Sequence, residues 1–261
     1  RVLGVHLEGP YLSPKLPGAQ LADSIRKPDV VEFTELVEAG PVIMITLAPE
    51  EPGANQLMAA AQDAGVAVVI GHTNATYEEC MDAIERGAIQ ATHTFNAMTG
   101  LHHRQPGVLG AVLSNDAIYG QLIADNVHVH PATMKVFARC KGVERAILIT
   151  DAMRAAGLPP GQYDLGGQPV RVADGQCRLM DGTLAGSVLT MDVALRTFLA
   201  ACDWSLADAW PVTSRTAATS LSLDHELGSI RPGYLADMVV LNRQLQVVAT
   251  IVGGEVVYKR P

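Results

Sequence analysis

The sequence predicts an α/β protein built around a parallel sheet, and three observations support that class. Six short apolar runs recur through the first 150 residues, and helical stretches separate most of them. The runs are apolar nearly throughout, as is typical of parallel strands that are buried on both faces. Four of the runs have a metal-ligand or acid–base side chain at their end or within the next two residues, namely Glu8, His72, His93 and Asp151. Six consecutive βα units favour a barrel, with a doubly wound sheet as the alternative. No GxGxxG follows any strand, which weighs against a dinucleotide-binding sheet.

The order of elements changes after Asp151. Before it, we expect strands at 2–7, 42–47, 66–70, 88–93, 118–124 and 145–150. We expect helices at 28–39, 51–64, 76–86 and 131–141. Residues 99–117 are expected to form a glycine-containing loop with a short apolar piece. After Asp151 we expect β-hairpins on a long loop at 159–185, helices at 188–202, 206–210 and 213–220, and antiparallel strands within 228–258.

Composition excludes several classes of function. With 261 residues, 48% of them hydrophobic, the chain can bury a large core. The net charge is −8 and no basic run is longer than the RK at 26–27, so we expect neither nucleic-acid binding nor electrostatic attachment to a membrane. The four cysteines lie far apart without a CxxC pair, which is typical of reduced thiols in a cytoplasmic enzyme.

The N-terminus shows no signal peptide, and no apolar stretch reaches the ~18–20 residues of a membrane span. The chain opens directly into a strand without an initiator Met, which we interpret as the middle of a longer protein.

Three residues have the properties of metal ligands. Glu8 follows the first apolar run in HLEGP, where a buried carboxylate is expensive unless it is paired or bound to a metal. His72 in GHTNAT and His93 in ATHTFNAM repeat one pattern, an apolar strand followed by a histidine and a polar loop. Each alone could be a capping or core residue, but two histidines and a carboxylate at neighbouring strand ends indicate a catalytic metal site with one open position.

Two further residues are candidates for acid–base chemistry. Asp151, in ITDAM, ends the last barrel-like strand and is placed to act as a general base, although an aspartate there could also cap a helix. His128, in IADNVHVH, could donate to a substrate oxygen, whereas His130 is interpreted as structural. His6 is interpreted as a packing residue or a residue that supports the ligands.

Arg104 and Asn96 are the candidates for holding an anion, because arginine offers a planar fork that suits phosphate. His102 and His103, beside Arg104, are expected to be solvated.

These segments, together with RKPD, TLAPE, DGTLAGSVLTM and GSIRPGYLADMVVLN in this order, closely resemble the N-acetylglucosamine-6-phosphate deacetylases of the amidohydrolase superfamily. The resemblance covers essentially the whole chain. It implies a (β/α)8 TIM-type barrel together with a small β-sandwich. Six of the eight βα units of that barrel are present in this sequence. The implied domains are an incomplete barrel at 1–227 and the C-terminal part of the sandwich at 228–261.

The resemblance also implies roles for individual residues. Glu8, His72 and His93 would bind a divalent metal ion, zinc being the first expectation, and Asp151 would be the catalytic acid and base. Whether one or two ions bind is left open. Substrate contacts would come from Ala19, Gln20, Asn96, Ala97, Arg104, His128, Leu184, Ala185 and Gly186. Many relatives carry His where Gln20 stands, and Arg104 would reach the phosphate of a neighbouring subunit in a homodimer.

The implied reaction is hydrolysis of N-acetylglucosamine 6-phosphate to acetate and glucosamine 6-phosphate in a cytoplasmic enzyme. The motifs do not distinguish the C4 epimer, so a deacetylase of N-acetylgalactosamine 6-phosphate is an alternative. A second alternative is a non-catalytic fragment, because the missing strands leave the barrel open, and a site needs preorganisation to within ~0.5 Å.

Overall fold

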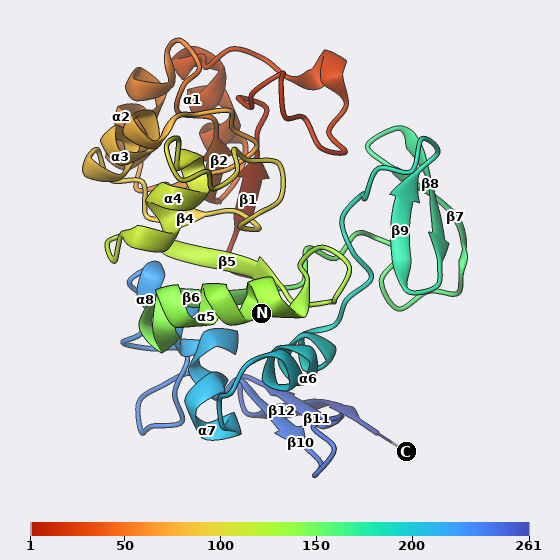
Figure 1. Cartoon of the computed structure of the whole chain (residues 1–261). Coiled ribbons are helices and arrows are strands. Elements are labelled where there is room, and N and C mark those ends of the chain that lie inside the picture. The colour runs from red at the N-terminus through yellow and green to blue at the C-terminus, as the bar shows by residue number, and fades with distance from the viewer. Residues whose placement is uncertain (1, 261) are drawn as a thin grey trace.

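The computed structural model describes residues 2–260 and has a curled parallel sheet at its centre (Figure 1). The six strands are β1 (Val5–Glu8), β2 (Val42–Leu47), β3 (Ala67–Ile70), β4 (Gln90–Ala91), β5 (Tyr119–Ile123) and β6 (Ala146–Ile149). They are hydrogen-bonded in strict chain order, β1-β2-β3-β4-β5-β6. A doubly wound sheet reverses its order at a switch point, so this order rules out the alternative and identifies a partial barrel.

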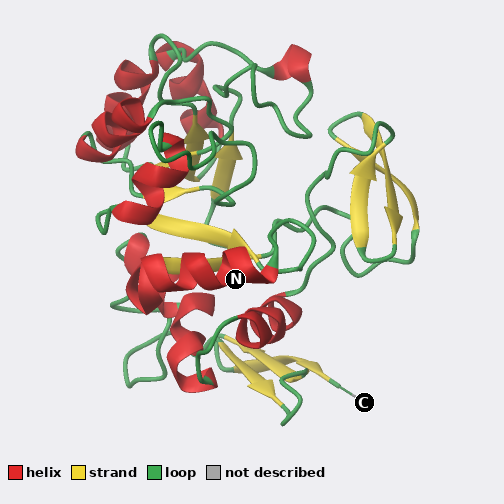
Figure 2. Cartoon of the chain, in the orientation of Figure 1, coloured by secondary structure: helices red, strands yellow, loops and turns green. Residues whose placement is uncertain are grey.

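Helices follow the strands and cover the outer face of the sheet (Figure 2). They are α1 (Val30–Ala39), α2 (Ala54–Asp63), α3 (Tyr77–Glu85), α4 (Gly107–Ser114) and α5 (Pro131–Arg145). Local sequence determines where two of them begin. Asp29 accepts hydrogen bonds from the first turn of α1, and Thr76 with Glu79 forms a capping box on α3. Each such cap stabilises a helix by about 1 kcal/mol.

The expectation of a loop over 99–117 is wrong, because this segment contains α4. Two glycines and no strong cap made the helix hard to recognise, since glycine disfavours helix interiors. Burial overrides propensity here: Val108, Leu109 and Val112 are buried in the core formed by β2–β4 and α2–α3. A Cβ at Gly110 would collide with the ring of Pro106, so glycine is required at this position of the helix.

A second, three-stranded antiparallel sheet follows β6, as the sequence predicts. It consists of β7 (Gly161–Leu165), β8 (Gln168–Ala173) and β9 (Gln176–Leu179). In Figure 1 this sheet stands apart from the parallel sheet and is joined to it by two extended segments. It has a small apolar core of its own, in which Val170, Val172 and Cys177 pack with Met153 and Ala185.

The remaining elements follow the β7–β9 sheet and complete the chain. They are α6 (Met191–Ala201), α7 (Leu206–Ala209), α8 (Arg215–Ser220), β10 (Met238–Leu241), β11 (Val247–Val252) and β12 (Glu255–Lys259), with 3₁₀ turns at Ala22–Ser24 and Trp210–Thr213. β10–β12 form an antiparallel sheet, and every residue of β12 is exposed. Within residues 2–260, no helix is both long enough and apolar enough to cross a membrane.

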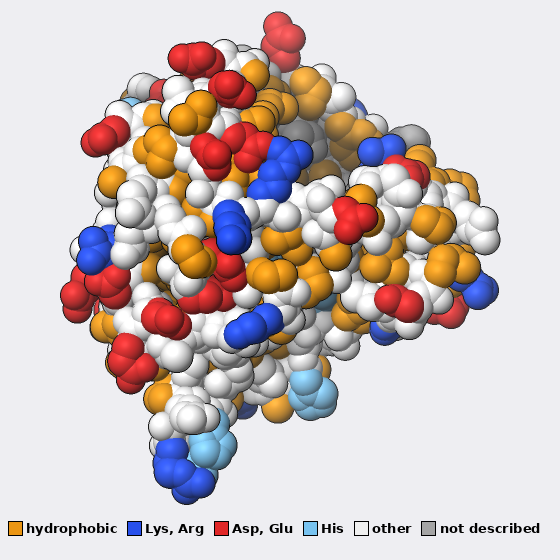
Figure 3. All heavy atoms as spheres, turned by 90° about the horizontal axis from the view of Figure 1, so that it is seen from above, with side chains coloured by type: hydrophobic (Ala, Val, Ile, Leu, Met, Phe, Trp, Pro, Cys, Tyr) orange, Lys and Arg blue, Asp and Glu red, His pale blue; other side chains and the backbone are white. Residues whose placement is uncertain are grey.

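Acidic and basic side chains are interspersed on the face shown in Figure 3, rather than gathered into one basic patch.

Candidate metal centre and active site

The carboxyl ends of four parallel strands deliver the charged side chains of the site. Glu8 is the last residue of β1, and His72, His93 and Asp151 each stand two residues beyond β3, β4 and β6. Because the strands are parallel and adjacent, these ends meet at one mouth of the partial barrel. The sequence predicts this placement, and the four side chains line a common cavity.

The backbone at this mouth is held in an unusual conformation. His72, His93 and Asp151 have positive φ angles of 46°, 28° and 50°. Non-glycine residues seldom adopt this region, and such strain persists only where the surrounding structure enforces it, often at functional sites. The turn after each strand therefore directs its side chain inward at a conformational cost.

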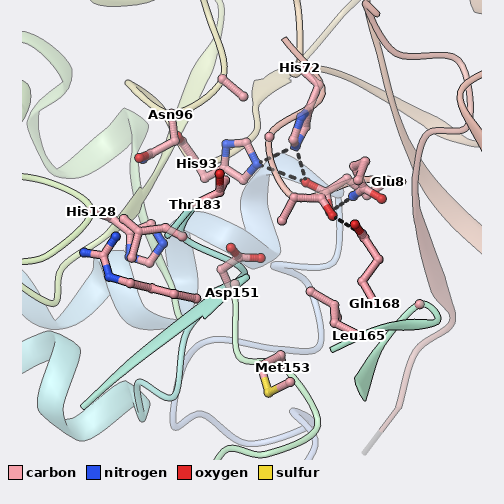
Figure 4. Close-up of a pocket in the computed structure, with 18 of the residues that line it drawn as sticks. Glu8, His72, His93, Asn96, His128, Asp151, Met153, Leu165, Gln168 and Thr183 are labelled. Carbon is pink, nitrogen blue, oxygen red and sulfur yellow. Dashed lines mark hydrogen bonds and ion pairs between the residues drawn. The ribbon is translucent and has the colours of Figure 1, made fainter. Parts of the chain in front are cut away.

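Glu8, His72 and His93 converge on one point (Figure 4). Glu8 Oε1 lies 3.0 Å from Nε2 of His72 and 3.0 Å from Nε2 of His93, and the two Nε2 atoms are 3.1 Å apart. Tetrahedral zinc with bonds of about 2.0–2.1 Å would hold its ligand atoms about 3.3 Å apart. Among the described residues this is the one group of three such side chains whose ligand atoms lie within 4.8 Å of one another.

The hydrogen bonds of the two imidazoles leave their Nε2 atoms available to a metal. Nδ1 of His72 lies 3.1 Å from the carbonyl oxygen of Leu16, which can only accept, so Nδ1 donates there. Nε2, which faces Glu8, is the atom that would give its lone pair to a metal in place of the hydrogen bond to Glu8. Nδ1 of His93 is buried and has no hydrogen-bond partner among residues 2–260, so its polar contacts run through Nε2. The donor set of two imidazoles and one carboxylate therefore fits a divalent metal.

The surroundings of the two carboxyl groups in the site shift their pKa values in opposite directions. Burial raises the pKa of Glu8, but hydrogen bonds from His72 and His93 outweigh burial and hold that pKa well below its ordinary value. Burial raises the pKa of Asp151, and the negative charge of Glu8 raises it further against the opposing effect of His93. Burial lowers the pKa of His93, but the hydrogen bond and charge of Glu8 outweigh it and raise that pKa. Glu8 is thus a permanent anion, whereas Asp151 exchanges a proton more readily.

The cavity has a volume of about 680 Å³, within the ordinary range for a small-molecule site. Eleven of the thirteen predicted site residues line it: Glu8, Ala19, Gln20, His72, His93, Asn96, Ala97, His128, Asp151, Leu184 and Gly186. The other two do not. Ala185 is fully buried in the core of the antiparallel sheet, and Arg104 is exposed beside His103 outside the cavity.

Comparison with known proteins supports what the site geometry indicates. The profile of the amidohydrolase family matches residues 1–257. The chain belongs to the amidohydrolase family. Its sequence is 42% identical to an N-acetylglucosamine-6-phosphate deacetylase of Lysinibacillus sphaericus, over 98% of this chain and 66% of that protein. It is 39% identical to an N-acetylgalactosamine-6-phosphate deacetylase of Escherichia coli O157:H7, over 98% of this chain and 68% of the relative.

Solved structures agree with the sequence comparison. The N-acetylglucosamine-6-phosphate deacetylase of Thermotoga maritima superposes with a TM-score of 0.94 at 38% identity, covering 99% of this chain and 70% of its own. An aspartate-to-alanine variant of the N-acetyl-D-glucosamine-6-phosphate deacetylase of Mycobacterium smegmatis was solved in complex with N-acetyl-D-glucosamine-6-phosphate. It superposes with a TM-score of 0.92 at 37% identity, over 97% of this chain and 68% of that one. The resemblance and the partial barrel expected from the sequence are confirmed. The chain spans about two thirds of the length of the curated relatives it matches.

Five other histidines of this amidohydrolase chain were singled out in the sequence, and each has identifiable surroundings. Nδ1 of His128 donates to Oδ2 of Asp125 at 2.7 Å, so Nε2 accepts when the ring is neutral and donates when it is protonated. Burial raises the pKa of Asp125, but its hydrogen bonds from His128 outweigh burial and lower it. His6 contacts the hydroxyl of Thr46 at 2.7 Å, and His130 caps α5. His102 and His103 are exposed.

Sequence reasoning missed the contribution of the β7–β9 sheet to the cavity. Leu165, Gln168 and Arg178 of this sheet line the cavity, as does Thr183 in the segment after β9. A long loop inserted after the last barrel strand was the available signal, because loops of that length are often functional. Nothing in the local sequence showed which of its side chains would face the mouth of the barrel.

Proposed function

We propose that this amidohydrolase removes the acetyl group from N-acetyl-D-glucosamine 6-phosphate, yielding acetate and D-glucosamine 6-phosphate. The observation that carries the proposal is the convergence of Glu8, His72 and His93 beside Asp151 in one cavity. The names of the relatives supply the substrate class, and their identity over nearly all of this chain supports transferring it.

Glu8, His72 and His93 would hold the divalent ion, with zinc as the first candidate. When bound, the ion would polarise the amide carbonyl and lower the pKa of water from 15.7 toward ~7. Two neutral imidazoles and one carboxylate leave a net positive centre, which favours an incoming oxygen.

Asp151 would carry the proton between the two halves of the reaction. Its carboxylate accepts a proton from the attacking water as the new C–O bond forms at the acetyl carbonyl. The resulting carboxylic acid then returns that proton to the sugar nitrogen at C2 as the C–N bond breaks. The raised pKa of Asp151 suits a group that must hold the proton between these steps. His128, oriented by its hydrogen bond to Asp125, would contact the carbonyl oxygen where negative charge develops.

The other cavity residues would orient the sugar. We assign its contacts to Ala19, Gln20, Asn96, Ala97, Leu184 and Gly186, all of which line the cavity. Ala185 would support Leu184 and Gly186 from within the buried core. Such contacts remote from the amide supply binding energy that positions it for attack.

The phosphate requires a cation, and two arginines are candidates. Arg178 on β9 is the one Lys or Arg among the described residues that line the cavity, and its guanidinium is fixed by Gln176 and by the carbonyl of Gly182. Arg104 lies outside the cavity, where it would serve the site of a second copy in a homodimer. We propose that Arg178 binds the phosphate within its own chain.

Substituting each arginine separates these roles. Arg178→Ala is expected to raise KM for N-acetylglucosamine 6-phosphate roughly 10-fold or more, since a charged hydrogen bond contributes ~1.5–3 kcal/mol. Activity on unphosphorylated N-acetylglucosamine should not change. Arg104→Ala is the matched variant. If KM for the phosphorylated substrate rose only in Arg104→Ala, and the rise depended on protein concentration, the phosphate would be bound by Arg104 of a neighbouring subunit instead of by Arg178.

The C4 epimer is a second candidate substrate, because one relative is an N-acetylgalactosamine-6-phosphate deacetylase at 39% identity. The ratio of kcat/KM for the two phosphorylated epimers decides between them.

We also propose the architecture and setting that the sequence suggests. Residues 1–227 would form the catalytic barrel and 228–261 part of a β-sandwich. The cytoplasm is the proposed location, since all four cysteines are free thiols.

Acetate release from N-acetylglucosamine 6-phosphate by the purified chain, supplied with zinc, tests the proposed function directly. We expect release that a chelator abolishes and zinc restores. A chain that binds zinc but releases no acetate from either epimer would contradict the proposal and support the non-catalytic alternative.

A further inference from the structure

A short loop, Leu16–Gln20, contacts two of the three candidate metal ligands through the atoms that do not face the metal position. Its first carbonyl, at Leu16, accepts from Nδ1 of His72 at 3.1 Å. At its other end, Nε2 of Gln20 donates to Oε2 of Glu8 at 3.0 Å, which leaves Oε1 facing both histidines. Each contact fixes the orientation of a ligand, and such supporting contacts strongly influence metal affinity.

The same loop packs closely against the ring of His72. Gly18 has a φ of +59°, and a Cβ at this position would lie 2.8 Å from Cε1 of His72. A residue with a side chain would therefore be strained in its backbone and would also displace the imidazole. A shift of this loop would therefore also shift the His72 ring.

A residue from the antiparallel sheet holds the loop in place. Gln168, the first residue of β8, donates from Nε2 to the carbonyl oxygen of Ala19 at 2.8 Å (Figure 4). The side chain of Ala19 packs against the apolar core of that sheet. This contact joins residues 149 positions apart and connects the β7–β9 sheet to the loop behind the ligands.

We propose that Gln168 is a positioning residue for the metal centre, acting through the Leu16–Gln20 loop on Glu8 and His72. The inference rests on the proposed metal site. Because Leu165 and Arg178 of the same sheet line the cavity, displacement of this sheet weakens metal binding, and a substrate that holds the sheet in place strengthens it.

Gln168→Glu tests this role with little change of shape, since it replaces the N–H donor by an oxygen that faces the carbonyl of Ala19. We expect the Kd for Zn²⁺, measured by competition with a chromogenic chelator, to rise roughly 10-fold, near the lower limit for supporting contacts. Gln168→Ala should behave similarly. Gln162→Ala is the matched control, because Gln162 is an exposed glutamine in β7 of the same sheet, and it should leave the Kd unchanged.

Hydrogen exchange in the metal-free chain provides a second readout. Backbone amides of residues 13–24 should exchange faster in Gln168→Glu than in wild type or Gln162→Ala. An unchanged Zn²⁺ affinity in both Gln168 variants would overturn the inference, whatever the exchange shows, while leaving the metal site intact. A wild-type chain that binds no Zn²⁺ would instead overturn the metal centre and the proposed function with it.

Discussion

Asp151→Asn is expected to lower kcat for acetate release by about 10³-fold while leaving metal content unchanged. General acid–base catalysis by one positioned group typically contributes 10²–10⁴-fold, and here the same carboxyl serves in both proton transfers. Asparagine has the same shape and tolerates a positive φ like the 50° of Asp151, so the backbone turn should survive the change. The measurement is kcat for the phosphorylated substrate, together with zinc content after dialysis.

Asp174→Asn is the matched control for this substitution. Asp174 is also an aspartate with positive φ, 53°, but it is exposed and lies in the turn between β8 and β9 outside the cavity. We expect its variant to keep the wild-type kcat. If Asp151→Asn turned over at a comparable rate, Asp151 would have no role in proton transfer, and the β6 strand end would serve only to shape the cavity.

The parts of the fold and site that could be predicted from sequence are those encoded locally. An apolar run followed by a polar residue is a short-range pattern, and the end of a parallel strand has a fixed place in the sheet. Glu8, His72, His93 and Asp151 could therefore be assigned to one mouth before any contact was known, and the structure places all four on one cavity.

The parts that could not be predicted depend on contacts between distant segments. Helix α4 forms because Val108, Leu109 and Val112 are buried by neighbouring elements, against the propensity of its glycines. The pairing of Gln168 with Ala19 spans 149 positions, and no local pattern encodes it. Arg104 is a case that local sequence leaves undecided: its loop leaves it outside the cavity of its own chain, and its proposed role toward a neighbouring subunit stays a prediction.

Glu8→Gln is expected to weaken zinc binding by more than about 100-fold and to abolish acetate release at ordinary zinc concentrations. Glutamine has nearly the same size as glutamate, and its amide oxygen can still accept the hydrogen bond from Gln20. The change removes the only negatively charged ligand among the three. Contacts that merely support a ligand contribute 10–100-fold to metal affinity, so loss of the ligand's own charge should exceed that range. The measurement is the Kd for Zn²⁺ by chelator competition.

Glu51→Gln is the matched control, because it removes the same negative charge near the same end of the partial barrel. Glu51 is half-buried after β2 and accepts a hydrogen bond from Ser13 at 3.3 Å, but it does not line the cavity. Its variant should bind zinc with wild-type affinity, because the effect at Glu8 comes from coordination rather than from the net charge of the region. Equal weakening in both variants would mean that long-range charge attracts the ion. In that case the convergence of Glu8 with His72 and His93 would be an ordinary hydrogen-bond cluster, in which the two histidines stabilise the Glu8 carboxylate.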